Sequence, residues 1–237
     1  MKDKIKIEVC CGSIDDVIVA SQHKIDRIEL NSALELGGLS PTIATLKASK
    51  AQTNLPICCM VRPRTAGFYY SEAQFKVMLN EASSLLENGA DGIVFGFLNI
   101  DNTIDIKRTK QMVKLIKSYH KEAIFHKAFD ETPDLISAAQ SLIDCQVDRI
   151  LTSGGLNYPN IEKGYPILKT LIKQYHKHLE ILIGGGINAE NIIKTIQETN
   201  TKNIHMSAKK NYQDNGEYLA VSHSRLSEIL KQLPSNK

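Results

Sequence analysis

The sequence predicts an α/β fold, a single (β/α)8 barrel of the TIM type over residues 1–237. Short apolar runs alternate with amphipathic segments along the whole chain, as expected for parallel strands that are buried on both faces. The length of 237 residues fits one such barrel, which typically takes about 250 residues. An open Rossmann-like sheet is the alternative, but no G-x-G-x-x-G motif follows the first apolar run.

Each expected strand is a short apolar run bounded by polar residues or glycine. The runs are Ile5–Cys11, Arg27–Leu30, Ile57–Arg62, Gly92–Leu98, Ala123–Phe129, Arg149–Ser153, Ile181–Gly184 and Asn203–Ser207. The polar stretch Lys209–Ala220 follows the last run, and we expect it to be a loop.

The segments between the strands carry helix start signals. Some have a serine followed three residues later by an acid or amide, the capping-box spacing, and others have a polar cap directly before proline. Helices are expected to start at Ser13, Ser40, Ser71, Thr132, Asn188 and Ser222.

The composition excludes several classes of protein. The formal net charge is only +3 and no Lys/Arg block stands out, so we expect no nucleic-acid partner. The charged N-terminus does not resemble a signal peptide, and no apolar run approaches the ~20 residues needed to cross a bilayer. We therefore expect a cytoplasmic protein with no membrane partner. The five cysteines include no C-x-x-C pair, which argues against a structural zinc site and a disulfide framework.

Alternation along each strand sorts its side chains between the helix layer and the barrel axis. Aliphatic residues occupy one parity, so the other parity faces inward. The inward set is Glu8, Cys10, Glu29, Asn31, Cys58, Met60, Arg62, His126, Asp130, His205 and Ser207. Most of these residues lie near strand C-termini, where the active sites of barrels lie.

The inward charges allow two interpretations. Each could be a paired core residue with no further role, and we expect Arg62 to pair with Glu8, Glu29 or Asp130 because an isolated buried charge is costly. Taken together, the carboxylates, the arginine and the histidines indicate a polar cavity at the mouth.

Glycines near the end of the chain favour an anionic ligand. The triplet Gly184–Gly186 ends the seventh run before a helix start, and Ser207 ends the eighth. Loops after strands seven and eight form the usual phosphate site of barrels. Gly185, Gly186 and Ser207 are therefore candidate anion-binding residues, although a tight turn would also need glycine.

Sulfur residues favour a soft metal. Cys10, Cys58 and Met60 all face inward by parity, and thiolate and thioether ligands select Cu(I). Cysteine and methionine are also common inert core residues, which is the interpretation we favour for Cys58. Cys10 lies nearer the mouth and is the best candidate metal ligand.

Motifs along nearly the whole chain resemble the CutC copper homeostasis family. They include Glu-Val-Cys at 8–10, Asp-Arg-Ile-Glu-Leu at 26–30, Arg-Pro-Arg at 62–64, Phe-His-Lys-Ala-Phe-Asp at 125–130 and His-Met-Ser-Ala at 205–208. The resemblance implies a cytoplasmic TIM-type barrel, often a homo-oligomer (dimer or tetramer), that is linked to copper tolerance and Cu(I) binding.

The sequence departs from the family pattern at two positions. The family's proposed copper ligands are cysteines that match Cys10 and position 31, but Asn31 supplies no thiolate. Met60 or a histidine could take its place. Lys127 stands where the family usually has arginine, and by parity it should face away from the axis.

Two functions follow, with no organic cofactor motif for either. The first is copper homeostasis through Cu(I) binding at Cys10. The second is an enzyme acting on a small anionic, phosphorylated metabolite, with His126 as acid or base because an unperturbed histidine titrates near neutrality. Glu8, Glu29 or Asp130 would assist it, with His205 nearby, and Arg62 would hold negative charge. A scaffold that acts by oligomerising is a third reading, which leaves the polar mouth unexplained.

Overall fold

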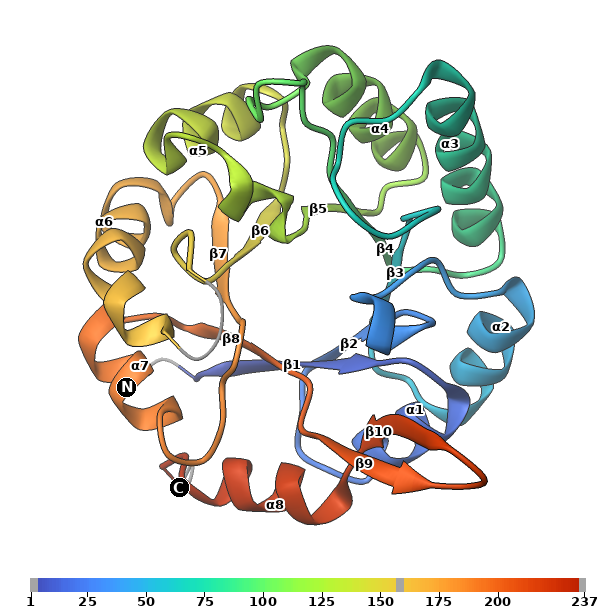
Figure 1. The fold of residues 1–237 in the computed structure, drawn as a ribbon, viewed down its shortest axis with the longest axis vertical. Coiled ribbons are helices and arrows are strands. Elements are labelled where there is room, and N and C mark those ends of the chain that lie inside the picture. Colours follow the sequence, from blue (N-terminus) through green and yellow to red (C-terminus); the bar gives the residue numbers. More distant parts are fainter. Residues whose placement is uncertain (1–3, 157–159, 235–237) are drawn as a thin grey trace.

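The computed structural model describes residues 4–156 and 160–234, and it confirms the closed (β/α)8 barrel. Neighbouring parallel strands pair in chain order, and the eighth pairs with the first (Figure 1). The single domain expected over residues 1–237 includes positions outside the described ranges. The barrel strands are β1 (Lys6–Cys11), β2 (Arg27–Leu30), β3 (Ile57–Met60), β4 (Gly92–Phe95), β5 (Glu122–Phe125), β6 (Arg149–Thr152), β7 (Glu180–Ile183) and β8 (Asn203–Met206).

Helices surround the barrel and bury its main apolar core against the outer faces of the strands (Figure 1). The α-helices are α1 (Ile14–Ser21), α2 (Ile43–Gln52), α3 (Glu72–Glu87), α4 (Ile106–Ser118), α5 (Leu135–Asp144), α6 (Tyr165–Tyr175), α7 (Ile192–Thr199) and α8 (His223–Lys231). Short 3-10 helices, η1 (Leu34–Leu36), η2 (Lys127–Glu131) and η3 (Ile161–Gly164), follow three of the strands. Among the described residues, no helix is long and apolar enough to span a bilayer.

The helix starts divide into two groups. Ser13, Ser71 and Ser222 cap their helices as expected, because each side-chain oxygen accepts a hydrogen bond from a first-turn backbone N–H. The starts expected at Ser40, Thr132 and Asn188 are wrong by two or three residues, since the caps are Thr42, Asp134 and Asn191. Thr42 and Asp134 are themselves good caps and lie just beyond the prolines, so the helix begins at the later polar residue.

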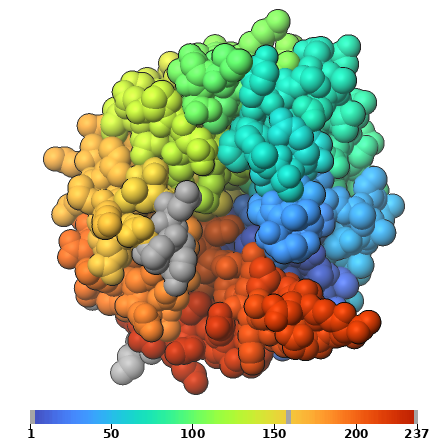
Figure 2. Space-filling model, in the orientation of Figure 1, coloured from blue at the N-terminus to red at the C-terminus, as the bar shows by residue number. Residues whose placement is uncertain are grey.

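Two further expectations are corrected. The fifth strand ends at Phe125 rather than Phe129, and the chain turns into η2, so strand alternation does not orient residues 126–130. The expected loop Lys209–Ala220 is mostly an antiparallel hairpin of β9 (Lys209–Gln213) and β10 (Glu217–Val221). Its turn holds Asn215 and Gly216 at positive φ, the residue types that tight hairpin turns favour. The hairpin lies beside α1 at the rim of the face in Figure 2.

The barrel interior is apolar on one side and polar on the other. Cys58, Met60, Val94 and Ile124, from β3, β4 and β5, form a separate buried apolar cluster. Gly92 completes the packing, because a Cβ there would lie 2.9 Å from the Cys58 sulfur. Charged and polar side chains from β1, β2, β6 and β8 fill the other side, and the candidate site lies there.

Candidate functional site

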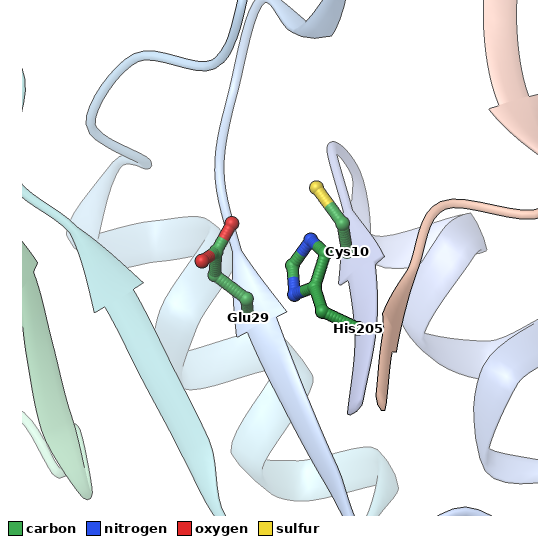
Figure 3. A group of neighbouring side chains, drawn as sticks. All are labelled: Cys10, Glu29 and His205. Atoms are coloured by element: carbon green, nitrogen blue, oxygen red, sulfur yellow. The ribbon is translucent and has the colours of Figure 1, made fainter. Parts of the chain in front are cut away.

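Cys10, Glu29 and His205 converge at the mouth from three adjacent strands. Cys10 on β1 is level with Glu29 on β2, and β8 pairs with the other edge of β1. A sulfur, a carboxylate oxygen and a ring nitrogen from these residues all lie within 4.8 Å of one another (Figure 3). All three residues are buried. Their inward orientation confirms the expectation from strand alternation.

Asn31 completes what we call the mouth cluster: Cys10, Glu29, Asn31 and His205. Its amide Nδ2 donates to the Glu29 carboxylate at 2.8 Å and approaches the Cys10 sulfur at 3.4 Å. Its Oδ1 and Glu29 Oε2 are buried and have no hydrogen-bond partner among the described residues. Gly38 makes room for this arrangement, because a Cβ there would lie 2.6 Å from Asn31 Oδ1.

Burial and mutual charge set the protonation of the mouth cluster. Burial raises the pKa of the Cys10 thiol and that of the Glu29 carboxyl. Burial alone would lower the pKa of His205, but the charge of Glu29 and hydrogen bonds with Cys10 and Glu8 raise it well above its usual value. Without a ligand, the cluster therefore holds a thiol and an imidazolium at neutral pH.

A second polar group lies deeper, at the N-terminal ends of the strands. We call it the lower network: Glu8, Arg27, Glu122, Arg149 and Glu180. Glu8 Oε2 accepts from Arg27 Nε at 2.8 Å and from Arg149 Nη1 at 3.3 Å. Arg149 also pairs with Glu122 and Glu180, each at 2.6 Å. The side chains of Glu8 and both arginines are at most 7% exposed, so Glu8 pairs with the two arginines away from water.

His205 connects the two groups. Its Nδ1 lies 2.7 Å from Glu8 Oε1, which leaves Nε2 for a partner in the mouth cluster. Burial tends to raise the pKa of Glu8, but the hydrogen bond and charge of His205, with the charges of Arg149 and Arg27, lower it to about 2. A carboxylate behind a histidine fixes the ring and favours one tautomer, as in many metal sites of proteins.

Arg62 does not pair with Glu8, Glu29 or Asp130, so that expectation is wrong. Its guanidinium instead donates to the backbone carbonyls of Gly37, Gly38 and Ala66 at 3.0–3.2 Å. Two arginines of the lower network satisfy Glu8, and Arg62 lies too near the mouth to reach it.

The expectation that His126 titrates near neutrality is also wrong. Burial, with a smaller effect from the charge of Arg62, lowers its pKa to about 3. Its Nδ1 accepts the backbone N–H of Ala128 at 3.1 Å, so the ring is neutral and carries its proton on Nε2.

Asp130 binds Lys127 and Ser153 beside the glycine turn after β7. Lys127 Nζ lies 2.7 Å from Asp130 Oδ2 and also contacts Ser153 Oγ. A Cβ on Gly185 would lie 3.3 Å from Lys127 Nζ, so Lys127 faces the mouth rather than away from the axis. The 3-10 turn of η2 reverses the orientation that a strand would give it.

Of the residues expected to bind an anion, Gly185 lies against Lys127. Gly185 and Gly186 have φ of +98° and +102°, and the backbone N–H groups of both make no hydrogen bond within the described part of the chain. Ser207 is half-buried just after β8, and the hydrogen bonds of Lys127 go to Asp130 and Ser153 instead.

Sequence reasoning missed Arg27, Arg149 and Ser153, and it gave Lys127 the wrong orientation. Arg27 has the same strand parity as Glu29, so strict use of alternation would have found it. Arg149 opens a strand whose faces both look apolar, and Lys127 lies in a 3-10 turn with no regular period. Of the proposed substitutes for a second thiolate, Met60 lies in the apolar cluster, whereas His205 lies beside Cys10.

The comparisons with known proteins decide the family. The profile of the CutC family matches residues 5–210. The chain belongs to the CutC family. A CutC family protein of Treponema denticola is 44% identical over 206 residues, which cover 87% of this chain and 82% of the relative. A CutC family protein of Glaesserella parasuis is 38% identical over 86% of this chain and 83% of its own length.

Solved structures agree with the family and the fold. A structure described as the copper homeostasis protein CutC of Streptococcus agalactiae superposes with a TM-score of 0.80 at 28% identity, covering 85% of this chain and 97% of its own. A phosphoribosyl anthranilate isomerase of Thermococcus kodakaraensis superposes with a TM-score of 0.63 at 15% identity, covering 98% of this chain and 100% of its own. That second similarity concerns the barrel fold alone.

Proposed function

We propose that this CutC family protein acts in copper homeostasis by binding Cu(I) through Cys10 and His205. The observation that carries the proposal is the convergence of Cys10, Glu29 and His205, with ligand atoms within 4.8 Å of one another. A thiolate is a soft ligand and imidazole also suits copper, so both groups fit the metal. The copper homeostasis description of the Streptococcus agalactiae relative supports the same role.

The surrounding residues support particular roles in this binding. His205 would use Nε2 as its ligand atom, because Nδ1 faces Glu8 at 2.7 Å. Glu29 would be a third ligand or would balance the charge of the metal. Asn31, in the position of the family's second cysteine, would hold the Glu29 carboxylate in place with its 2.8 Å hydrogen bond.

The test is an anaerobic titration of the reduced protein with Cu(I) in competition with a Cu(I) chelator. Stoichiometric binding that is lost in Cys10→Ser and weakened in His205→Gln is the expected result. Cys58→Ser is the matched control, because Cys58 also faces the barrel interior but packs against Met60, Val94 and Ile124. Binding that persists in Cys10→Ser would contradict the proposal.

A specific observation favours a second candidate, an enzyme acting on a phosphorylated metabolite. Gly185 lies against the Lys127 ammonium, and the N–H groups of Gly185 and of the adjoining Gly186 make no hydrogen bond within the described residues, a combination that suits a phosphate group. We expect inorganic phosphate to bind about ten-fold more weakly to Lys127→Gln. Lys114→Gln, on the exposed face of α4, is the control. Equal phosphate binding by both variants and the native protein would exclude this site.

We also propose that the protein is located in the cytoplasm and forms a homo-oligomer. A role in copper homeostasis with reduced cysteines fits the cytoplasm, and a homo-oligomer, dimer or tetramer, fits the family. Light scattering during size-exclusion chromatography measures the assembly directly, and a monomer at all concentrations would contradict that expectation.

A further inference from the structure

Arg62 is a buried cation that no carboxylate neutralises. The residue is 7% exposed, and within the described ranges it forms no ion pair. Its Nη1 and Nη2 groups donate to the backbone carbonyls of Gly37, Gly38 and Ala66, which are neutral dipoles. Its Nε–H is buried and has no partner. Buried charges are rare unless they are paired, so a buried arginine without a carboxylate partner indicates a place for an anion.

His126 offers a second buried donor close to that cation. Because its Nδ1 accepts the N–H of Ala128, the proton is on Nε2, which is buried without a partner. Gly96 makes room for the ring, because a Cβ there would lie 2.3 Å from His126 Cε1. The Phe68 ring contacts both side chains, so the two groups lie near each other.

Phe68 contacts both groups and borders an opening to Arg62. Its ring centroid lies 5.3 Å from Arg62 Cζ and 4.8 Å from the centroid of His126. A cavity of about 360 Å³ lies next to this ring and is lined by Arg62, Ala66, Gly67, Phe68, Asn102 and Glu131. Glu131 is exposed and forms no ion pair with Arg62 in the described structure, so the charge of the arginine is still available.

We propose that Arg62 and His126 form a subsite for the carboxylate group of a small organic monoanion. One unpaired guanidinium matches one negative charge, and the neutral His126 ring adds an N–H donor without adding charge. The ligand would enter through the cavity and displace the half-buried Phe68 ring, which would then flank it. A monoanion fits better than a phosphate dianion, because the second negative charge would have no partner. The subsite includes none of the proposed metal ligands Cys10, Glu29 and His205.

The experiment follows the ring nitrogens of the histidines by NMR in protein labelled with 15N-histidine. Acetate, glycolate and pyruvate are the carboxylate probes, and inorganic phosphate is the comparison. His126→Phe assigns the His126 signals among the seven histidines. The expected result is a saturable shift of His126 Nε2 with at least one carboxylate and weaker binding of phosphate.

Two variants and one control test the residues, and carboxylate binding to them is measured by isothermal titration calorimetry because His126→Phe lacks the reporter nitrogen. Arg62→Lys keeps the charge but loses the Nε–H, and we expect carboxylate binding about ten-fold weaker in it and in His126→Phe. Arg64→Lys is the matched control, because Arg64 also donates to backbone carbonyls and lies over an aromatic ring, yet its hydrogen bonds are exposed. Arg64→Lys should bind as the native protein does.

Several outcomes overturn the proposal. They are the absence of any saturable shift of His126, phosphate binding equal to or tighter than carboxylate binding, and unchanged carboxylate binding in His126→Phe. If Arg62→Lys does not fold, His126→Phe decides the question alone. Cu(I) binding should be unchanged in His126→Phe, so failure of the carboxylate subsite is distinguishable from failure of the metal site.

Discussion

The lower network and the mouth cluster occupy the same barrel, but they differ in how far their buried polar groups pair with each other. In the lower network, Arg27 and Arg149 contact three carboxylates at 2.6–3.3 Å, and buried Arg27 Nη2, which makes no hydrogen bond, still forms an ion pair with Glu180 at 2.7 Å. In the mouth cluster, Glu29 Oε2 and Asn31 Oδ1 are buried with no partner among the described residues. The lower network closes one end of the barrel with paired charges. The mouth cluster has buried oxygen atoms that can still accept a hydrogen bond or bind a ligand.

Buried polar groups that pair with each other stabilise the fold, whereas buried polar groups without a protein partner are available for binding. A buried ion is tolerated when its hydrogen bonds are completed by the protein, and removal of one partner is then strongly destabilising. A buried polar atom without a partner costs stability, and such atoms gather where a ligand completes them. His205 belongs to the mouth cluster but also contacts the lower network, because its ring bonds Glu8 and lies beside Cys10 and Glu29.

The largest expected effect separates the two groups by stability. Glu8→Gln removes the charge that Arg27 and Arg149 share, and we expect it to lower the free energy of unfolding by about 3–5 kcal/mol. Glu29→Gln removes a carboxylate that burial already disfavours, so the change should be within about 1 kcal/mol. Urea denaturation measures the unfolding free energy of both variants. Equal losses of stability would show that Glu8 and Glu29 do not differ in their contribution to the fold.

Acid should weaken the lower network through Glu8. Its folded pKa of about 2 lies below the ordinary 4.5, so its contribution is present above pH 4.5 and is lost as the pH falls towards 2. The loss amounts to about 3 kcal/mol for a shift of this size. Unfolding free energies measured over this range should fall less steeply in Glu8→Gln. Parallel profiles for the two proteins would exclude Glu8 as the source.

Cu(I) binding at the mouth cluster should strengthen as the pH rises. The pKa values of Cys10 and His205 are both raised, so each holds a proton near neutrality that the metal must displace. Release of about two protons predicts an affinity that rises about 100-fold per pH unit between about pH 6 and 8. Chelator competition at several pH values measures this slope. A slope near zero would show that neither group is a ligand.

The smallest expected effect concerns Asn31. Asn31→Cys places a second thiol beside Cys10, which Asn31 now approaches at 3.4 Å, and we expect Cu(I) affinity to rise about ten-fold. Asn31→Ser supplies no thiolate and is the control, with no gain expected. If both variants bind alike, position 31 does not face the metal.

Strand alternation predicted much of the candidate site from sequence. Cys10 and Glu29 lie on regular strands, and His205 lies on the strand that closes the barrel, so parity orients all three correctly. Alternation failed at His126 and Lys127, because β5 ends at Phe125 and a 3-10 turn follows. The pair Asn215–Gly216 is a hairpin-turn signal that is visible in the sequence, although a loop was expected there.

By itself the sequence determined the barrel, the family and part of the set of polar side chains that face inward, because local period and motif depend only on neighbours along the chain. Which of those side chains meet was decided by tertiary structure. Glu8 pairs with Arg149, 141 positions away, and not with Arg62, because barrel closure and depth along the strand set which charges come within reach. The same closure brings His205 beside Cys10, and no local pattern contains that contact.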